Sequence, residues 1–240
     1  MLNGFDLSNW QKDADAGKLP GDFAIMKATE GTSYVNPSCD RHYQQAKNAG
    51  KLLGVYHFAS GTDAIAEADF FIRNITGYIH HAVMALDWEA DAVKRGPNWA
   101  MNWLWRVHEK TGVWPLIYMS QSVANNTAWA DVASKCGLWV ARYPTSRAVG
   151  YDGGMDWGKA PTGPWKTSAI WQYTSTGRLP GYGGNLDLNH AYMTRDGWNK
   201  YACGDSGNVS GADKPSGKPD DIFKVSTLEN DDYKVTIERK

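Results

Sequence analysis

The stretch HHAVMALDWEAD, residues 80–91, decides the fold class that this sequence predicts and also raises the question of function. A short apolar run, Ala82 to Leu86, ends abruptly in Asp87-Trp88-Glu89. A continuous apolar run, rather than an alternating one, is typical of a strand covered on both faces, as in a parallel sheet. Because side chains alternate along a strand, we expect Asp87 and Glu89 on one side and Trp88 on the other.

Similar apolar runs recur along the chain and predict eight strands: Leu2–Leu7, Phe23–Ala28, Leu52–Phe58, Ala82–Leu86, Leu116–Met119, Leu138–Ala141, Ala169–Tyr173 and Leu186–Leu188. Helical patterns lie between several of them, at Pro37–Gly50, Asp63–Thr76, Pro97–Thr111 and Ser122–Lys135. The second of these helices is expected to bury Ile65, Ala68, Ile72 and Ile75. Residues Ser146–Thr167 are rich in Gly and Pro and predict a long loop. This alternation predicts an α/β barrel of the TIM type, irregular in its last third.

Composition narrows the possible functions. The 240 residues carry a net charge of −1, so no global field would attract nucleic acid or an anionic membrane. The three cysteines are far apart and lack a C-x-x-C motif, which argues against a thiolate metal site. The N-terminus lacks the pattern of a secretory signal, and no apolar stretch reaches membrane-spanning length. The 12 Trp and 12 Tyr exceed what a core requires, and their flat faces suit the stacking of sugar rings.

A change in composition at Cys203 predicts the domain organisation. Residues 1–203 contain all the tryptophans and form the predicted catalytic barrel. Residues 204–220 are Gly, Ser, Asp, Pro and Lys with almost nothing apolar, which predicts a flexible linker. Residues 221–240 are too few to build a core, so they are either a docking tail or the truncated start of a further module.

Polar residues stand where the predicted strands end, which is where barrels of this kind carry their chemistry. In chain order these residues are Asp6, Lys27, Tyr56, Asp87 with Glu89, Tyr118, Trp139 with Arg142, Gln172, and Asp187 with Asn189. Four carboxylates would then meet at one mouth ringed by aromatic side chains. Crowded like charges raise at least one pKa, so one carboxyl keeps a proton near neutral pH. A proton donor beside ionised carboxylates is what glycosidic bond cleavage requires.

The ordered motifs G-F-D-L-S-N-W-Q, M-K-A-T-E-G-T, G-V-Y-H-F, L-D-W-E and L-D-L-N resemble the glycoside hydrolase family 25 lysozymes, the Chalaropsis-type muramidases. The resemblance spans about residues 3–200. It implies a flattened (β/α)5β3 barrel that hydrolyses the β-1,4 bond between N-acetylmuramic acid and N-acetylglucosamine in bacterial peptidoglycan. It also implies retention of configuration, with no metal or cofactor.

The resemblance assigns roles to the acidic residues. It implies that Glu89 is the general acid/base, with Asp87, Asp6 and Asp187 as its acidic partners. It further implies that Asp87 orients the substrate's own acetamido nucleophile, with a covalent enzyme intermediate as the rival mechanism. A protonated Glu89 is expected to be less solvated than Asp87, and a donor, Tyr118 or Tyr56, is expected to reach Asp87.

The remaining strand-end residues form the predicted substrate-binding set: Tyr56, Tyr118, Trp139, Gln172, Lys27 and Arg142. Trp10, Trp88, Trp139 and Trp171 are candidates for the sugar cleft, and half of them are expected in the core. His57 is expected to be a hydrogen-bonded core histidine, and Glu30 either pairs with Lys27 or lines the rim.

A different reading of the same cleft is a non-catalytic glycan-binding barrel, which the intact Asp87 and Glu89 disfavour. The absence of a secretory signal fits a phage endolysin released from the host cytoplasm, and a bacterial autolysin whose signal was removed is nearly as compatible. We expect a monomeric catalytic domain, and neither nucleic acid nor an inserted membrane as a partner.

Overall fold

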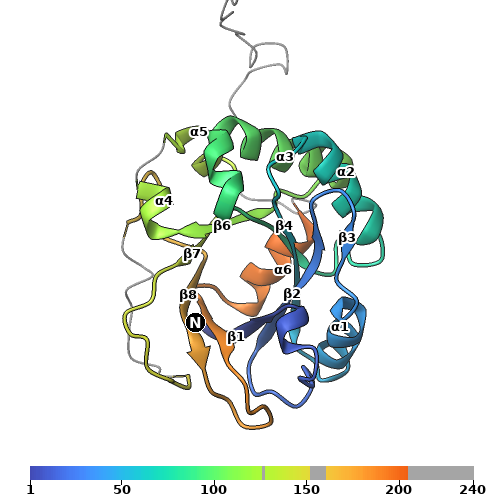
Figure 1. The fold of residues 1–240 in the computed structure, drawn as a ribbon, viewed down its shortest axis with the longest axis vertical. Coiled ribbons are helices and arrows are strands. Elements are labelled where there is room, and N and C mark those ends of the chain that lie inside the picture. The colour runs from blue at the N-terminus through green and yellow to red at the C-terminus, as the bar shows by residue number, and fades with distance from the viewer. Residues whose placement is uncertain (126–127, 152–160, 205–240) are drawn as a thin grey trace, which may run out of the picture. The chain divides into compact units, whose positions relative to one another are not determined.

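Eight strands close into a barrel in the computed structural model, which describes residues 1–125, 128–151 and 161–204 (Figure 1). The strands are β1 Leu2–Leu7, β2 Phe23–Glu30, β4 Leu52–Phe58, β5 Val83–Asp87, β6 Leu116–Ser120, β7 Leu138–Ala141, β8 Ile170–Gly177 and β9 Leu186–Ala191. Their order is β1-β9-β8-β7-β6-β5-β4-β2, and pairing of β1 with β2 closes the ring. A two-residue strand, β3 Tyr34–Val35, pairs with the end of β2. The predicted strands and the α/β barrel are therefore confirmed.

The last strand corrects the expectation of a parallel sheet. The pairs from β1 through β2, β4, β5, β6 and β7 to β8 are parallel, whereas β9 runs antiparallel to both β8 and β1. Only a short connection joins β8 to β9, and a parallel crossover needs a dozen residues or more. As a result, β9 begins at the mouth where its neighbours end, and Asp187 lies opposite Asp6 in the register.

Helices cover the outside of the strands and plug one end of the barrel (Figure 1). They are α1 Cys39–Asn48, α2 Ala64–Asn74, α3 Gly96–Thr111, α4 Gln121–Asn125, α5 Ala130–Ala133 and α6 Arg195–Cys203, with two 3-10 turns, η1 Asn9–Gln11 and η2 Ala90–Arg95. The first three confirm the predicted helices. The predicted helix Ser122–Lys135 is instead two short helices, and α6 was not predicted. Within the part of the chain that is described, no helix has the length and apolarity to span a membrane.

Most of the face predicted to be buried in α2 is confirmed. Ala68 and Ile75 are fully buried and Ile72 packs against the core, whereas Ile65 is 39% exposed. The buried face also includes Phe71 and the charged Glu67, which were not expected there. Glu67 is tolerated at this position because its oxygens are hydrogen-bonded inside the protein.

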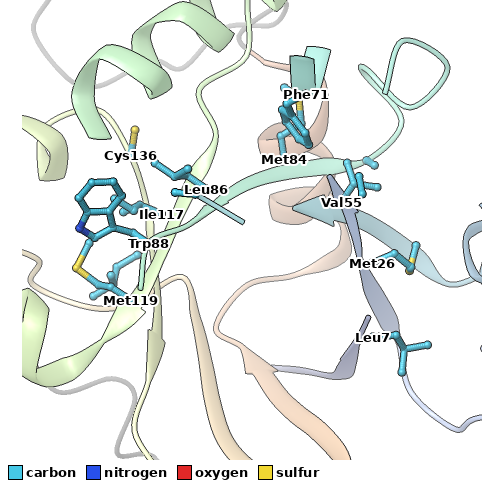
Figure 2. Close-up of a cluster of buried hydrophobic side chains, with 14 of the residues drawn as sticks. Leu7, Met26, Val55, Phe71, Met84, Leu86, Trp88, Ile117, Met119 and Cys136 are labelled. Carbon is cyan, nitrogen blue, oxygen red and sulfur yellow. The ribbon is translucent and has the colours of Figure 1, made fainter. Parts of the chain in front are cut away.

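Two apolar layers surround the strands. The inner layer fills the barrel and includes Phe23 and Ile170, with Trp198 of α6, whose indole N–H donates to the carbonyl of Leu53 at 3.0 Å. The outer layer packs between strands and helices, and Figure 2 shows part of it: Leu7, Met26, Val55, Phe71, Met84, Leu86, Trp88, Ile117, Met119 and Cys136. Since Trp88 belongs to this outer layer, the predicted alternation around it is confirmed.

The predicted domain boundaries are not tested. The barrel's last described helix ends at Cys203. All but Gly204 of the predicted linker 204–220, and the whole of the tail 221–240, lie outside the described residues. Within the predicted loop Ser146–Thr167, residues 146–151 and 161–167 form no helix, and 152–160 also lie outside the description.

Candidate active site

A cavity of about 250 Å³ opens at the mouth where seven strands end and β9 begins. Its lining residues are Asp6, Ser8, Trp10, Lys27, Tyr56, Phe58, Asp87, Glu89, Tyr118, Trp139, Tyr143, Gln172 and Asp187. All the predicted site residues except Arg142 are among them. The barrel register explains this convergence, because Asp87 lies between Phe58 of β4 and Tyr118 of β6.

Glu89 reaches the cavity because the chain turns sharply after β5. Asp87 ends the strand, Trp88 packs into the outer layer, and Glu89 precedes η2 in extended conformation. The next residue, Ala90, has a φ of +51°, the left-handed region that an L-residue with a Cβ adopts at a cost of roughly 1–2 kcal/mol. The turn thus keeps Glu89 on the same side as Asp87.

Asp6 is the only one of the four carboxylates that accepts hydrogen bonds from described residues. Its Oδ2 accepts from Nδ2 of Asn189 at 2.7 Å and from Nε2 of Gln172 at 2.8 Å. Burial and the nearby Asp187 raise the pKa of Asp6 well above its usual value, and these two amide donors limit the rise. Asp6 is therefore held in one orientation and has partners that favour its charged form.

Asp87 is buried without such partners. It is 7% exposed, and its Oδ1 has no hydrogen-bond donor among the described residues. Burial and Glu89 raise the pKa of Asp87 well above its usual value, while Lys27 lowers it. The expectation that Tyr118 or Tyr56 donates to Asp87 finds no support here, because the Tyr118 hydroxyl donates to Gln172 instead, at 2.9 Å.

Glu89 and Asp187 complete the acidic cluster. Burial raises the pKa of Glu89, with Lys27 opposing the rise, and burial together with Glu89 raises the pKa of Asp187 to about 7. Glu89 is half-buried and Asp87 buried, so the expectation that Glu89 is the less solvated of the two is wrong. The reason is position: Asp87 ends a strand inside the barrel, whereas Glu89 lies at the rim. Four coupled carboxyls with raised pKa values still provide a proton donor near neutral pH.

Lys27 is the cation that lines this cavity. Its ammonium lies 4.4 Å from the centre of the Phe58 ring and 2.5 Å from Oε2 of Glu30. The predicted alternative, in which Glu30 pairs with Lys27, is therefore confirmed. Lys27 lowers the pKa of both Asp87 and Glu89, which partly offsets the crowding of negative charge.

The candidate tryptophans divide equally between the cavity and the core. Trp10 is 90% exposed at the rim, and Trp139 lines the cavity wall, whereas Trp88 and Trp171 are fully buried in the outer layer. Trp10 lies inside a capping box formed by Ser8 and Gln11, and its backbone N–H donates to the Ser8 hydroxyl at 3.2 Å. An exposed indole beside a polar cavity is a suitable face for stacking a sugar ring.

Arg142 is not among the lining residues, whereas its neighbour Tyr143 is. Trp139 and Ala141 belong to the inner layer and Val140 to the outer one. Continued alternation places Tyr143 inside and Arg142 outside. The same period of two in the sequence would have identified Tyr143. Ser8 and Phe58 also line the cavity and were not predicted. The same period would have identified them, because each follows a predicted residue by two positions.

A closed barrel that gathers four carboxylates, a lysine and exposed aromatic rings at one mouth defines a glycoside-cleaving enzyme as its class. The comparisons with known proteins agree. A family model described as "Glycosyl hydrolases family 25" matches residues 5–182, and the chain belongs to this family of glycoside hydrolases.

Relatives and solved structures give the scale of the similarity. N,O-diacetylmuramidase of Chalaropsis sp. is 31% identical over 192 residues, covering 71% of this chain and 87% of that protein. Lysozyme M1 of Streptomyces globisporus is 29% identical over 209 residues, covering 78% of this chain and 67% of that protein. The crystal structure of the bacterial lysozyme from Streptomyces coelicolor superimposes with a TM-score of 0.72 at 27% identity, covering 84% of this chain and 96% of that one.

Proposed function

We propose that this chain is an N-acetylmuramidase that hydrolyses the β-1,4 bond between N-acetylmuramic acid and N-acetylglucosamine in bacterial peptidoglycan. The observation that carries the proposal is the convergence of Asp6, Asp87, Glu89 and Asp187 on one cavity of a family 25 barrel. The curated relatives named lysozyme and N,O-diacetylmuramidase support the choice of substrate. The bacterial cell wall is accordingly the proposed site of action, and whether the protein reaches it by phage lysis or by secretion stays a prediction.

Glu89 is proposed as the general acid/base. It lies at the rim, where a bridging oxygen between two sugars can approach, and burial raises its pKa against the effect of Lys27, which helps it to keep a proton. In the first step Glu89 gives this proton to the leaving oxygen as the bond to C1 breaks. In the second step it takes a proton from the water that attacks C1. Asp6, which is held by two amides, faces the developing positive charge.

Asp87 is proposed to orient the acetamido group of the sugar bound next to Glu89. Its carboxylate accepts no hydrogen bond from the described residues, and an acetamido N–H would supply the missing donor. The acetamido carbonyl oxygen then attacks C1 from the face opposite the leaving group. Attack by water on the resulting cyclic intermediate gives overall retention. Direct attack by Asp87 on C1, which forms a covalent glycosyl-enzyme, is the rival mechanism.

Clearing of a Gram-positive cell-wall suspension by wild type and by Glu89→Gln tests this function. We expect the variant to lose about 10³-fold or more of the activity, because proton donation and charge stabilisation are lost together. Asp91→Asn is the matched control, since Asp91 lies two residues further on, exposed and paired with Lys94. It should clear the wall like wild type. Equal clearing by Glu89→Gln would remove the role of Glu89.

Analysis of the reducing ends separates the enzyme classes. New N-acetylmuramic acid reducing ends are expected, whereas new N-acetylglucosamine ends or free amino groups would indicate a glucosaminidase or an amidase. Wild type that binds the wall without releasing any product would support the non-catalytic glycan-binding alternative.

A further inference from the structure

Two buried amides on neighbouring strands point at the same oxygen of Asp6. Gln172 of β8 and Asn189 of β9 are direct partners in the sheet register, and both are buried. Each donates an N–H to Oδ2 of Asp6, at 2.8 Å and 2.7 Å respectively. Within the described parts of the chain, the carboxylates of Asp87, Glu89 and Asp187 receive no comparable bond.

The other partners of the two amides complete their hydrogen bonding, and for Asn189 the chemistry of the partner also sets the orientation of the amide. The indole N–H of Trp139 donates to Oδ1 of Asn189 at 2.8 Å. Because an indole can only donate, the oxygen of Asn189 must face Trp139 and its NH₂ group must face Asp6. Oε1 of Gln172 accepts from the hydroxyls of Tyr118 at 2.9 Å and Tyr143 at 2.5 Å. Both lone pairs of this oxygen are used, so Gln172 also presents its NH₂ group to Asp6.

This arrangement changes the expected role of Gln172, which the sequence placed in the substrate-binding set. Its carbonyl oxygen is saturated and one of its two N–H groups is bonded to Asp6, so most of its hydrogen-bonding capacity is used inside the protein. A buried amide with this pattern is suited to holding another side chain in place.

We propose that Asn189 and Gln172 are positioning residues that hold the Asp6 side chain as a carboxylate anion. A proton bound by the four acidic side chains of the cavity is then carried by one of the other three, Asp87, Glu89 or Asp187. The proposal rests on the muramidase function given above, in which Asp6 acts as a negative charge and Glu89 as the acid. Several titratable groups face Asp6 across the cavity: Asp187 from β9, Asp87 and Glu89 from the end of β5, and the phenols of Tyr56, Tyr118 and Tyr143. Lys27 is the cation of the same lining.

The two amides act on Asp6 against the other groups around it. Burial, Asp187 and Glu89 raise the pKa of Asp6 well above its usual value, and the hydrogen bonds from Asn189 and Gln172 limit this rise. Asp87 experiences the same burial with no amide donor, and its pKa is raised by Glu89, Asp6 and Asp187. Removing either amide should therefore make Asp6 take up a proton at a higher pH.

Asn189→Leu and Gln172→Leu test the proposal, because each removes one donor while keeping a similar volume. Carboxyl carbon NMR titration should show the pKa of Asp6 rising by about one pH unit in each variant, the effect of one charge-assisted hydrogen bond. The acidic limb of the kcat/KM profile should move to higher pH by a similar amount. Tyr143→Phe, which removes one rim hydroxyl that donates to Gln172, should move it less and in the same direction.

Thr174→Val is the matched control on β8. Thr174 is buried, and among the described residues its hydroxyl bonds only to the side chain and the backbone N–H of Thr176. The Thr174→Val variant should have a lower melting temperature, with an unchanged pKa of Asp6 and an unchanged acidic limb of the kcat/KM profile. An Asp6 pKa that is unchanged in folded Asn189→Leu and Gln172→Leu would overturn the proposal. Because the NMR titration needs no activity, a wild type that fails to cleave peptidoglycan would overturn the proposed function and leave this test valid.

Discussion

Two buried carboxylates lie close together in the chain's fold and behave in opposite ways. Glu67 of α2 is fully buried, and its oxygens accept from the backbone N–H and hydroxyl of Ser60, from the same two groups of Thr62, and from Nε2 of His57. Hydrogen bonding lowers the pKa of Glu67 to about 2 although burial raises it. Asp87 is also buried, its side chain accepts no hydrogen bond from the described residues, and its pKa is raised.

The difference shows that burial alone does not decide whether an acid is structural or reactive. Burial disfavours both charges, and the supply of donors reverses the outcome at Glu67. The histidine that bonds to Glu67 is itself held in place. Nδ1 of His57 is hydrogen-bonded to the Thr29 hydroxyl at 2.8 Å, and its ring stacks on Trp103. This confirms His57 as a hydrogen-bonded core histidine. Asp87 instead lines the cavity, and its side chain receives no hydrogen bond from the described residues, which suits the substrate-orienting role proposed for it.

The two regions are joined by the loop after β4. The backbone N–H of Ala59 donates to the carbonyl of Asp87 at 3.0 Å, and Glu67 fixes the next residues of this loop. Gly61 lies so close to η2 that an added Cβ would be 3.1 Å from the Cα of Ala92, and its φ is +74°. Glu67, whose oxygens are fully hydrogen-bonded, thus stabilises the loop that contacts the backbone of Asp87.

Of the changes that test this comparison, replacing Asp87 should have the largest effect on activity. Asp87→Asn is expected to lower kcat by about 10²–10³-fold with little change in KM, because an amide cannot supply the negative charge that orients the acetamido group. Its melting temperature at pH 7 should equal or exceed that of wild type, since a buried carboxyl without donors is removed. A variant that loses stability and keeps its kcat would contradict the contrast with Glu67.

The matching change at Glu67 should lower stability and leave activity nearly unchanged. Glu67→Gln places an NH₂ group among five donors and is expected to cost about 2–4 kcal/mol of the free energy of unfolding. Urea unfolding measures this cost, and kcat of the folded variant should stay within a few-fold of wild type. Asp69→Asn, on the same helix in a partly exposed pair with Arg106, is the control and should cost about 1 kcal/mol or less.

The pH dependence of stability should show the two regions with opposite signs. Glu67 has a depressed pKa, so its contribution is present above the normal value of 4.5 and is lost as the pH falls towards about 2. Asp187 has a pKa raised from 3.8 to about 7, so its ionisation destabilises the fold as the pH rises between these values.

Melting temperatures measured from pH 2 to pH 8 check these signs. Glu67→Gln should remove part of the rise at low pH, and Asp187→Asn should remove part of the decline towards neutral pH. A decline that is unchanged in Asp187→Asn would show that this carboxyl is not the group that titrates there.

The smallest effect is expected at the rim. Trp10→Ala should weaken binding of a soluble glycan by about 1–2 kcal/mol, a loss typical of one aromatic stacking face, without changing stability. Trp105→Ala is a suitable control, because Trp105 is partly exposed on α3 and lies outside the cavity lining. Equal glycan affinity in wild type and Trp10→Ala, measured by calorimetry, would remove Trp10 from the proposed sugar-binding surface.

Local patterns in the sequence were enough to predict much of the site. Eight apolar runs predicted the strands, and a period of two around Trp88 predicted that Asp87 and Glu89 share a side. At β7 the prediction chose Arg142, whereas the same period of two, applied onward from Trp139, would have chosen Tyr143, which lines the cavity. These features depend on neighbouring residues only, because the alternation of side chains along a strand is a property of the backbone itself.

The sequence by itself determined which acids reach the mouth of the barrel, and the tertiary structure decided what state each acid is in. The pairing of β9 with β1 and the amides on Asp6 join residues far apart in the chain, and Asn189 and Asp6 are separated by 183 positions. The pKa of a carboxyl depends on the donors and charges within a few ångströms, whatever their place in the sequence. The closed barrel brings Gln172 and Asn189 to Asp6, whereas the end of β4 and the loop after it supply the donors to Glu67. Among the described residues, neither arrangement gives the Asp87 side chain a donor.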